Sequence, residues 1–177
     1  MARYNTHMRT IYTIGHSTRT IDQFISLLKA HSIQELVDVR TVPKSRHNPQ
    51  FASDALAESL RQAGIQYLHL GALGGLRHAR KDSVNTGWEN ASFRGFADYM
   101  ATPEFKSGLE ALEALAEQQS VAIMCAEAVP WRCHRSLIAD ALTVRGWHVL
   151  HISSKKTAKL HELTPFLQVK DGQLTFP

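Results

Sequence analysis

The stretch MCAEAVPWRCHRSLIADAL, residues 124–142, decides the fold class of this chain. Its start completes the run SVAIMC, residues 120–125, which has the length and apolar character of a buried β-strand. From Cys133 onward the sequence has a helical pattern that continues to Gly146. A buried strand joined by a short polar loop to a helix is the repeating unit of α/β proteins.

The same alternation of strand and helix extends through the rest of the chain. Besides residues 120–125, short β-rich runs lie at 10–14, 35–39, 65–70 and 147–152. Besides the helix from Cys133, helical patterns cover 20–30, 53–64, 93–100 and 104–119, and Thr20 with Gln23 has the spacing of a capping box. Such spacing implies right-handed crossovers between parallel strands. The sequence therefore predicts an α/β fold: one mostly parallel, five-stranded sheet flanked by helices in a Rossmann-like three-layer architecture.

The length of 177 residues suits one domain with a substantial core. We expect a flexible leader over residues 1–9 and a single domain over residues 10–177. The pair Asp171-Gly172 is typical of a tight turn, and it predicts a small hairpin within residues 165–177.

The amino-acid composition indicates in which compartment the protein is expected and which kinds of partner it favours. The chain has two cysteines, too few for a disulfide scaffold, so a reducing cytoplasm is the expected location. Its apolar runs are far shorter than the ~20 residues of a membrane span, and no membrane partner is expected. A net charge of +4 favours anionic partners only modestly, and the oligomeric state is left open.

Ligands of open parallel sheets bind outside the carboxyl ends of the strands, which makes the residues after each strand the candidate site. The basic residues there predict an anion (phosphate) site, since arginine forks bind phosphate bidentately. We assign anion binding to Arg40, Arg46, Arg132, Arg135 and Ser17, with supporting roles for Asp38, Gly15, Gly74 and Gly75. Solvated arginines in ordinary polar loops are the alternative interpretation, and Asp38 could simply hold Arg40 or Arg46 in place.

The two cysteines allow three interpretations. They could be structural core residues, one could be a nucleophile, or the two could form a reversible disulfide. Cys133, at the start of a helix, is the better nucleophile candidate, because a helix N-terminus lowers a thiol pKa. The candidate catalytic residues at these strand ends are Cys133, Glu127, His134, Cys125 and His16.

No cofactor can be assigned from sequence motifs. The turn GALGG, residues 71–75, lacks the lysine and hydroxyl of a P-loop, and no dinucleotide fingerprint follows the first strand. Cys125, Cys133 and His134 lack the paired spacing of a structural zinc site, although His16 or His69 could complete a set of four ligands. We therefore predict no metal, and the cofactor is unknown.

Four segments together resemble the bacterial and archaeal family called domain of unknown function 488. They are YTIGHS, DVRTVPKSRHNPQF, YLHLGALGG and MCAEAVPWRCHRSLIAD, and the resemblance extends from about Tyr12 to about Ser153. The family has no established activity, so the resemblance implies a fold and a site position only. The motif residues that it implies are Gly15, His16, Ser17, Asp38, Arg40, Pro43, Arg46, Gly74, Gly75, Cys125, Glu127, Cys133, His134 and Arg135.

Three functions remain open from the sequence. The first is an enzyme that acts on a phosphate-bearing ligand, a nucleotide or nucleic acid, with Cys133 or Glu127 in covalent or acid–base roles. The second is a nucleic-acid-binding module in which Trp88, Phe93 and Trp131 stack on bases. The third is a thiol redox or stress protein that uses Cys125 and Cys133.

Overall fold

A computed structural model of the chain describes residues 9–177. The leader predicted over residues 1–9 lies outside the described residues, except for Arg9. Among residues 9–177, no helix combines the length and the apolar character that a membrane crossing requires.

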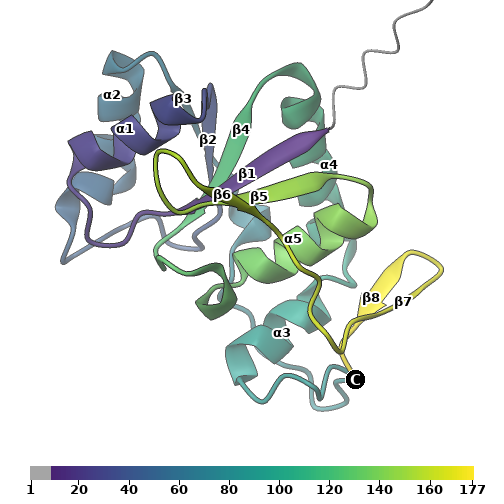
Figure 1. Cartoon of the computed structure of the whole chain (residues 1–177). Helices are drawn as coiled ribbons and strands as arrows, with labels where there is room; N and C mark the ends of the chain where they lie inside the picture. Colours follow the sequence, from purple (N-terminus) through teal and green to yellow (C-terminus); the bar gives the residue numbers. More distant parts are fainter. Residues whose placement is uncertain (1–8) are drawn as a thin grey trace, which may run out of the picture.

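The centre of the structure is a six-stranded sheet in the order β3-β2-β4-β1-β5-β6 (Figure 1). Its strands are β1 (Thr10–Gly15), β2 (Glu35–Asp38), β3 (Gln66–His69), β4 (Val121–Cys125), β5 (His148–Ile152) and β6 (Ala158–Leu160). The first five pair in parallel, which confirms the predicted α/β fold with a mostly parallel sheet.

The sixth strand is a feature that the sequence pattern did not predict. β6 pairs antiparallel to β5, because a tight turn reverses the chain: Ser153 donates its backbone N–H to the carbonyl of Thr157, and Thr157 to that of Ser154. β6 has only three residues, and none is fully buried. A strand this short and exposed at a sheet edge carries no hydrophobic alternation that could reveal it.

Five helices cover both faces of the sheet (Figure 1). They are α1 (Ile21–Ala30), α2 (Ser53–Gln62), α3 (Ala91–Tyr99), α4 (Pro103–Gln118) and α5 (Arg135–Val144). Alternate residues of each strand point to opposite faces. Ile14, Leu36 and Met124 therefore pack with α1 and α2 in one core cluster. Ile11, Val37, Ile123 and Cys125 pack with α3, α4 and α5 in the other.

Helix starts follow the local capping chemistry. Thr20 caps α1 in the predicted capping box: its hydroxyl accepts from the N–H of Gln23, whose side chain accepts from the N–H of Thr20. α3 begins two residues before the predicted Phe93, because the Asn90 side chain accepts the N–H groups of Ser92 and Phe93.

The C-terminal segment packs back onto the α3–α5 side. β7 (Gln168–Lys170) and β8 (Gln173–Thr175) form a separate antiparallel pair whose turn, Asp171-Gly172, has positive φ at both residues. The following Phe176 is fully buried and contacts the ring of Trp88. Trp88 also meets Phe93 and Phe166 edge to face, so two of the three aromatics considered for base stacking belong to this cluster.

Candidate functional site

A cleft of about 440 Å³ lies at the carboxyl ends of β1, β2 and β4. Three segments line it: His16–Thr18 after β1, residues 44–48 after β2, and residues 126–128 after β4. Of the predicted site residues, the structure brings His16, Ser17, Arg46 and Glu127 together in this cleft. Lys44 and Arg46 are exposed on its rim, where Glu127 is the carboxylate among the lining residues.

Arg135 lies beneath the loop that forms one wall of the cleft. The residue is 1% exposed, and its Nη2 donates to the backbone carbonyl of Ala128 over 2.9 Å. Its Nε and Nη1 have no hydrogen-bond partner within residues 9–177, where no carboxylate forms an ion pair with it either. A buried charge without a partner costs several kcal/mol after relaxation. The guanidinium therefore has unused capacity to bind an anion.

Gly15 allows the chain to close tightly around this arginine. A Cβ at position 15 would lie 1.7 Å from the carbonyl oxygen of Glu127 and 2.8 Å from Nη1 of Arg135. The loop after β4 is also tied to the end of β1 by two backbone bonds, from the N–H of His16 to Cys125 and from that of Ser17 to Ala126. Glycine at this position is thus required by close packing.

His16 and Ser17 form the end of the cleft above β1. The His16 ring stacks on Phe51 with centroids 4.4 Å apart, and its Nδ1 donates to the carbonyl of Ser17 over 2.8 Å. Burial lowers the pKa of His16. The neutral ring therefore keeps an unprotonated Nε2 that can accept a proton or a hydrogen bond. Ser17 has a left-handed backbone, φ 51°, and strain of this kind is concentrated at binding sites.

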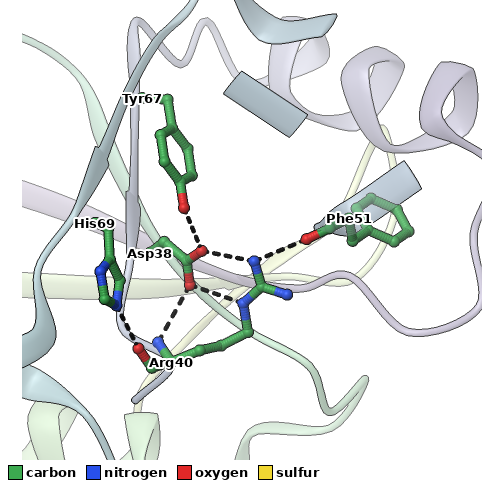
Figure 2. Close-up of polar contacts among 5 residues, drawn as sticks. All are labelled: Asp38, Arg40, Phe51, Tyr67 and His69. Carbon is green, nitrogen blue, oxygen red and sulfur yellow. Dashed lines mark hydrogen bonds and ion pairs between the residues drawn. The ribbon is translucent and has the colours of Figure 1, made fainter. Parts of the chain in front are cut away.

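Asp38 and Arg40 form a polar cluster on the α1–α2 face of the sheet, and their charges act on the pKa of His16 (Figure 2). The Asp38 carboxylate accepts from Nε and Nη2 of Arg40 over 2.9 and 2.6 Å and from the Tyr67 hydroxyl over 2.6 Å. Nη2 of Arg40 also donates to the carbonyl of Phe51, while His69 contacts the backbone oxygen of Arg40. Asp38 thus holds Arg40 in place, and Nη1 of this arginine is buried without a hydrogen-bond partner among residues 9–177.

The two cysteines lie on the opposite face, against α5. Both are free thiols, 3% and 6% exposed, within the α3–α5 core cluster. Burial raises the pKa of Cys133 well above its ordinary value. Burial acts in the same direction on Cys125, but the interaction with Cys133 and the charge of Arg135 lower the pKa of Cys125 overall. The raised pKa of Cys133 differs from the expectation that the helix start lowers it, because burial outweighs the helix dipole and the charge of Arg135.

His134 packs away from the cleft. Its Nε2 lies 2.9 and 3.0 Å from the carbonyl oxygens of Val39 and Leu73, so this nitrogen carries the proton. Burial lowers the pKa of His134 to about 4. Gly75 makes room for the ring, since a Cβ there would lie 2.5 Å from Nδ1, and Gly74 packs as closely against Thr41. His134, Gly74 and Gly75 therefore anchor the turn after β3.

Arg132 stands apart from the other predicted anion ligands. It is exposed at the end of the 3-10 turn Pro130–Arg132, and its side chain takes part in no hydrogen bond or ion pair that the described part of the chain contains. Two cations nearer the cleft were missed in the sequence. Lys44 lies on the rim, and Arg19 donates to the carbonyl of Gly15 over 2.5 Å while burial and the charge of Arg135 lower its pKa. Lys44 could have been found from the run PKSRH, but the contact made by Arg19 could not.

The chain is thus an α/β protein with a cleft at the carboxyl edge of its parallel strands, and Lys44 and Arg46 are among the residues that line it. The model of the family described as domain of unknown function DUF488 matches residues 20–142. The match includes the segments after β2, β3 and β4 but not Gly15–Ser17. The chain belongs to this family. No curated protein and no solved structure matches it. Among residues 9–177, no group of three or more histidine, cysteine, aspartate or glutamate side chains is arranged to hold a metal.

Proposed function

We propose that this protein binds a phosphate-bearing ligand in the cleft between residues 16–18, 44–48 and 126–128. The observation that carries the proposal is Arg135, a buried guanidinium with two unpartnered nitrogens directly behind the cleft wall. A phosphate oxygen supplies the negative charge and the acceptor that this group lacks. Lys44 and Arg46 add positive charge at the rim, where they attract the ligand.

Several neutral groups complete the environment for an anion. The Ser17 side chain, in the cleft wall, can donate a hydroxyl hydrogen. The backbone N–H groups of Glu127 and Ala128 donate to no acceptor within residues 9–177 and are available for ligand oxygens. Unprotonated Nε2 of His16 can accept a proton from a ligand hydroxyl or a water molecule, which is the role of a general base. The cleft thus combines anion recognition with one group suited to proton transfer.

Phosphate binding is tested by titrating the protein with inorganic phosphate at constant ionic strength and following the melting temperature and the binding heat. We expect Arg46→Ala and Lys44→Ala to weaken binding about 10-fold each, because each removes one charge-assisted contact. Arg61→Ala, on the exposed end of α2, is the matched control and should bind as the parent does. Equal affinities of all four proteins, or no binding by the parent, would contradict the proposal.

A specific observation favours a nucleotide as the ligand. Trp131 is 69% exposed on the same loop that carries residues 126–128, whereas Trp88 and Phe93 are packed in the aromatic cluster. An exposed indole on a loop that lines a phosphate site can stack on a base. We therefore expect Trp131→Ala to weaken the binding of adenosine monophosphate several-fold while the affinity for inorganic phosphate stays the same. Equal losses for both ligands would point to damage of the loop and would reject the nucleotide.

A further inference from the structure

The two cysteines converge behind the same cleft wall from different elements. Cys125 is the last residue of β4, and Cys133 precedes the first turn of α5. Their side chains share the α3–α5 core cluster, and both residues lie against Arg135: the Cys133 sulfur accepts its backbone N–H, and Cys125 pairs in register with Gly15, next to its guanidinium. The eight-residue separation is closed by the 3-10 turn Pro130–Arg132, which returns the chain to the sheet.

The positive charge of Arg135 acts on both thiols, and the geometry at Gly15 places its guanidinium beside Cys125. Cys125 is the parallel-register partner of Gly15, and Nη1 of Arg135 lies 2.8 Å from where a Cβ of Gly15 would stand. Adjacent strands are about 4.8 Å apart, so the guanidinium lies beside Cys125. Cys125 therefore lies beside a positive charge that stabilises a thiolate. Its sulfur also lies 3.7 Å from the carbonyl oxygen of Glu127.

Cys133 lies beside a group that can take its proton. Its sulfur accepts the backbone N–H of Arg135 over 3.4 Å, and it lies 3.5 Å from Nδ1 of His134. Because Nε2 of His134 carries the proton toward two carbonyls, Nδ1 is an acceptor. The Cys133 hydrogen thus has a base within contact distance.

We propose that Cys125 and Cys133 form a redox-active dithiol that is oxidised to a disulfide by a hydroperoxide, with Cys125 attacking first and Cys133 resolving. The burial of both sulfurs favours a small oxidant of this class over a protein disulfide, which needs an exposed sulfur for direct exchange. The inference stands on the thiol pair and does not depend on phosphate binding in the cleft.

The proposed reaction balances in two steps. The Cys125 thiolate attacks one peroxide oxygen; the S–O bond forms, the O–O bond breaks, and the other oxygen leaves as water after taking a proton, or as an alcohol from an organic peroxide. The Cys133 sulfur then attacks the resulting sulfenic acid; the S–S bond forms, the S–O bond breaks, and the hydroxide leaves as water with the Cys133 proton passed through His134. Two thiols lose two electrons and one peroxide gains two. An added dithiol restores the reduced pair.

The direct test needs only the parent chain. The fully reduced protein is treated with one equivalent of hydrogen peroxide in phosphate-free buffer, and remaining thiols are alkylated before digestion. Trypsin cleaves after Lys106, Arg132 and Arg135, so an internal disulfide joins residues 107–132 to the tripeptide Cys133–Arg135. We expect this cross-linked peptide in monomeric protein and its loss on reduction. Absence of the peptide, or a disulfide only between two chains, would overturn the proposal.

The order of attack is tested with single variants and a reagent that traps sulfenic acid. Cys133→Ser should accumulate trapped sulfenic acid at Cys125, whereas Cys125→Ser should leave Cys133 at least about 10-fold less labelled, because Cys133 is held as a thiol. The reverse pattern would overturn the assignment of Cys125 as the attacking thiol. Circular dichroism shows whether each variant is folded. If one variant unfolds, the digest of the parent protein still tests whether the disulfide forms. The oxidation is done without phosphate, so its failure would not bear on phosphate binding. A failed phosphate titration would likewise not bear on the disulfide.

Discussion

Nη1 of Arg135 lies 2.8 Å from the position that a Cβ would occupy on Gly15. The same hypothetical Cβ would stand 1.7 Å from the carbonyl oxygen of Glu127, which belongs to the loop after β4. The end of β1, the loop after β4 and the start of α5 therefore meet at one glycine. No side chain at position 15 is compatible with the observed cleft wall.

Gly15→Ala should destabilise the protein by about 2 kcal/mol or more, because overpacking of a rigid site costs about 1–3 kcal/mol and here the obstacle is backbone. Urea unfolding measures the change. Gly71→Ala is the matched control: a Cβ at that glycine would meet only the His69 ring at 3.5 Å, an ordinary contact. A loss of stability at Gly71 equal to that at Gly15 would show that the close approach at Gly15 is not the cause.

The cluster of Asp38, Arg40 and Tyr67 predicts a large stability loss from a small change. Asp38→Asn should lower the free energy of unfolding by about 3–5 kcal/mol, since it leaves the buried Arg40 without its counter-ion. Tyr67→Phe should cost only about 1 kcal/mol, because Arg40 still occupies the carboxylate.

Denaturant titration of both variants distinguishes these effects. The control is Glu58→Gln, which breaks the solvent-exposed ion pair with Arg61 on α2 and should leave the unfolding midpoint unchanged. If Asp38→Asn were as harmless as Glu58→Gln, the cluster would not contribute to folding.

The rule that ligands bind at strand ends predicts a site at the edge of the sheet where the structure has the cleft. Ser17, Arg46 and Glu127 each follow a strand whose apolar run is plain in the sequence, and the three segments meet because parallel strands end at one edge. Which of the residues near a strand end reach one another depends on the face of the sheet to which each side chain points. Side chains one residue apart on β2 point to opposite faces, so Asp38 packs with Tyr67 while Val37 packs toward α5.

Contacts between distant segments could not be predicted. The ring of His134 is held by carbonyls 95 and 61 residues away, which no local pattern encodes. The pKa of Cys133 is a further case: a helix start favours a reactive thiol, but the burial that raises its pKa exists only in the folded chain. The local sequence thus predicts which segments contain candidate site residues. The packing of the folded chain determines which of their side chains are reactive.

The hydrogen bonds of Asp140 on α5 hold the C-terminal segment in place, so we expect that segment to loosen when the carboxylate is replaced. Its buried carboxylate accepts from Nε2 of His161 over 2.7 Å and from both the N–H and the hydroxyl of Thr164. His161 in turn contacts His151 of β5, which contacts Thr13 of β1. The chain of bonds therefore ties the segment after β6 to the sheet.

Asp140→Asn should reduce stability by about 2 kcal/mol, because the amide nitrogen cannot accept from one of these buried donors. Hydrogen exchange measures the local part: the N–H groups of Thr164 and Leu167 should exchange faster, whereas those of β4 should keep their relative protection. Asp171→Asn, in the exposed β7–β8 turn, should leave both groups as protected as in the parent. Uniform acceleration throughout the sheet would instead indicate a purely global effect.

Buried histidines predict how stability depends on pH. Burial lowers the pKa of His134 to about 4 and is the largest cause that lowers the pKa of His151 to about 3. Below the ordinary histidine value of about 6.5, the unfolded chain binds protons that the folded chain does not, so stability falls as the pH falls from about 6.5 toward these values. His134 alone accounts for a loss of about 3 kcal/mol by pH 4.

Urea unfolding at a series of pH values between 7 and about 4.5 measures this slope, to which one buried histidine contributes at most about 1.4 kcal/mol per pH unit. His134→Gln retains a donor for the carbonyls of Val39 and Leu73 but cannot titrate, so the slope should become shallower by a large part of that amount even if the variant is less stable at pH 7. His47→Gln, at an exposed position on the cleft rim, should keep the parent slope. If His134→Gln retained the full slope, the proton uptake on unfolding would have to come from another group, and His134 would not be the buried neutral ring that its two carbonyl contacts imply.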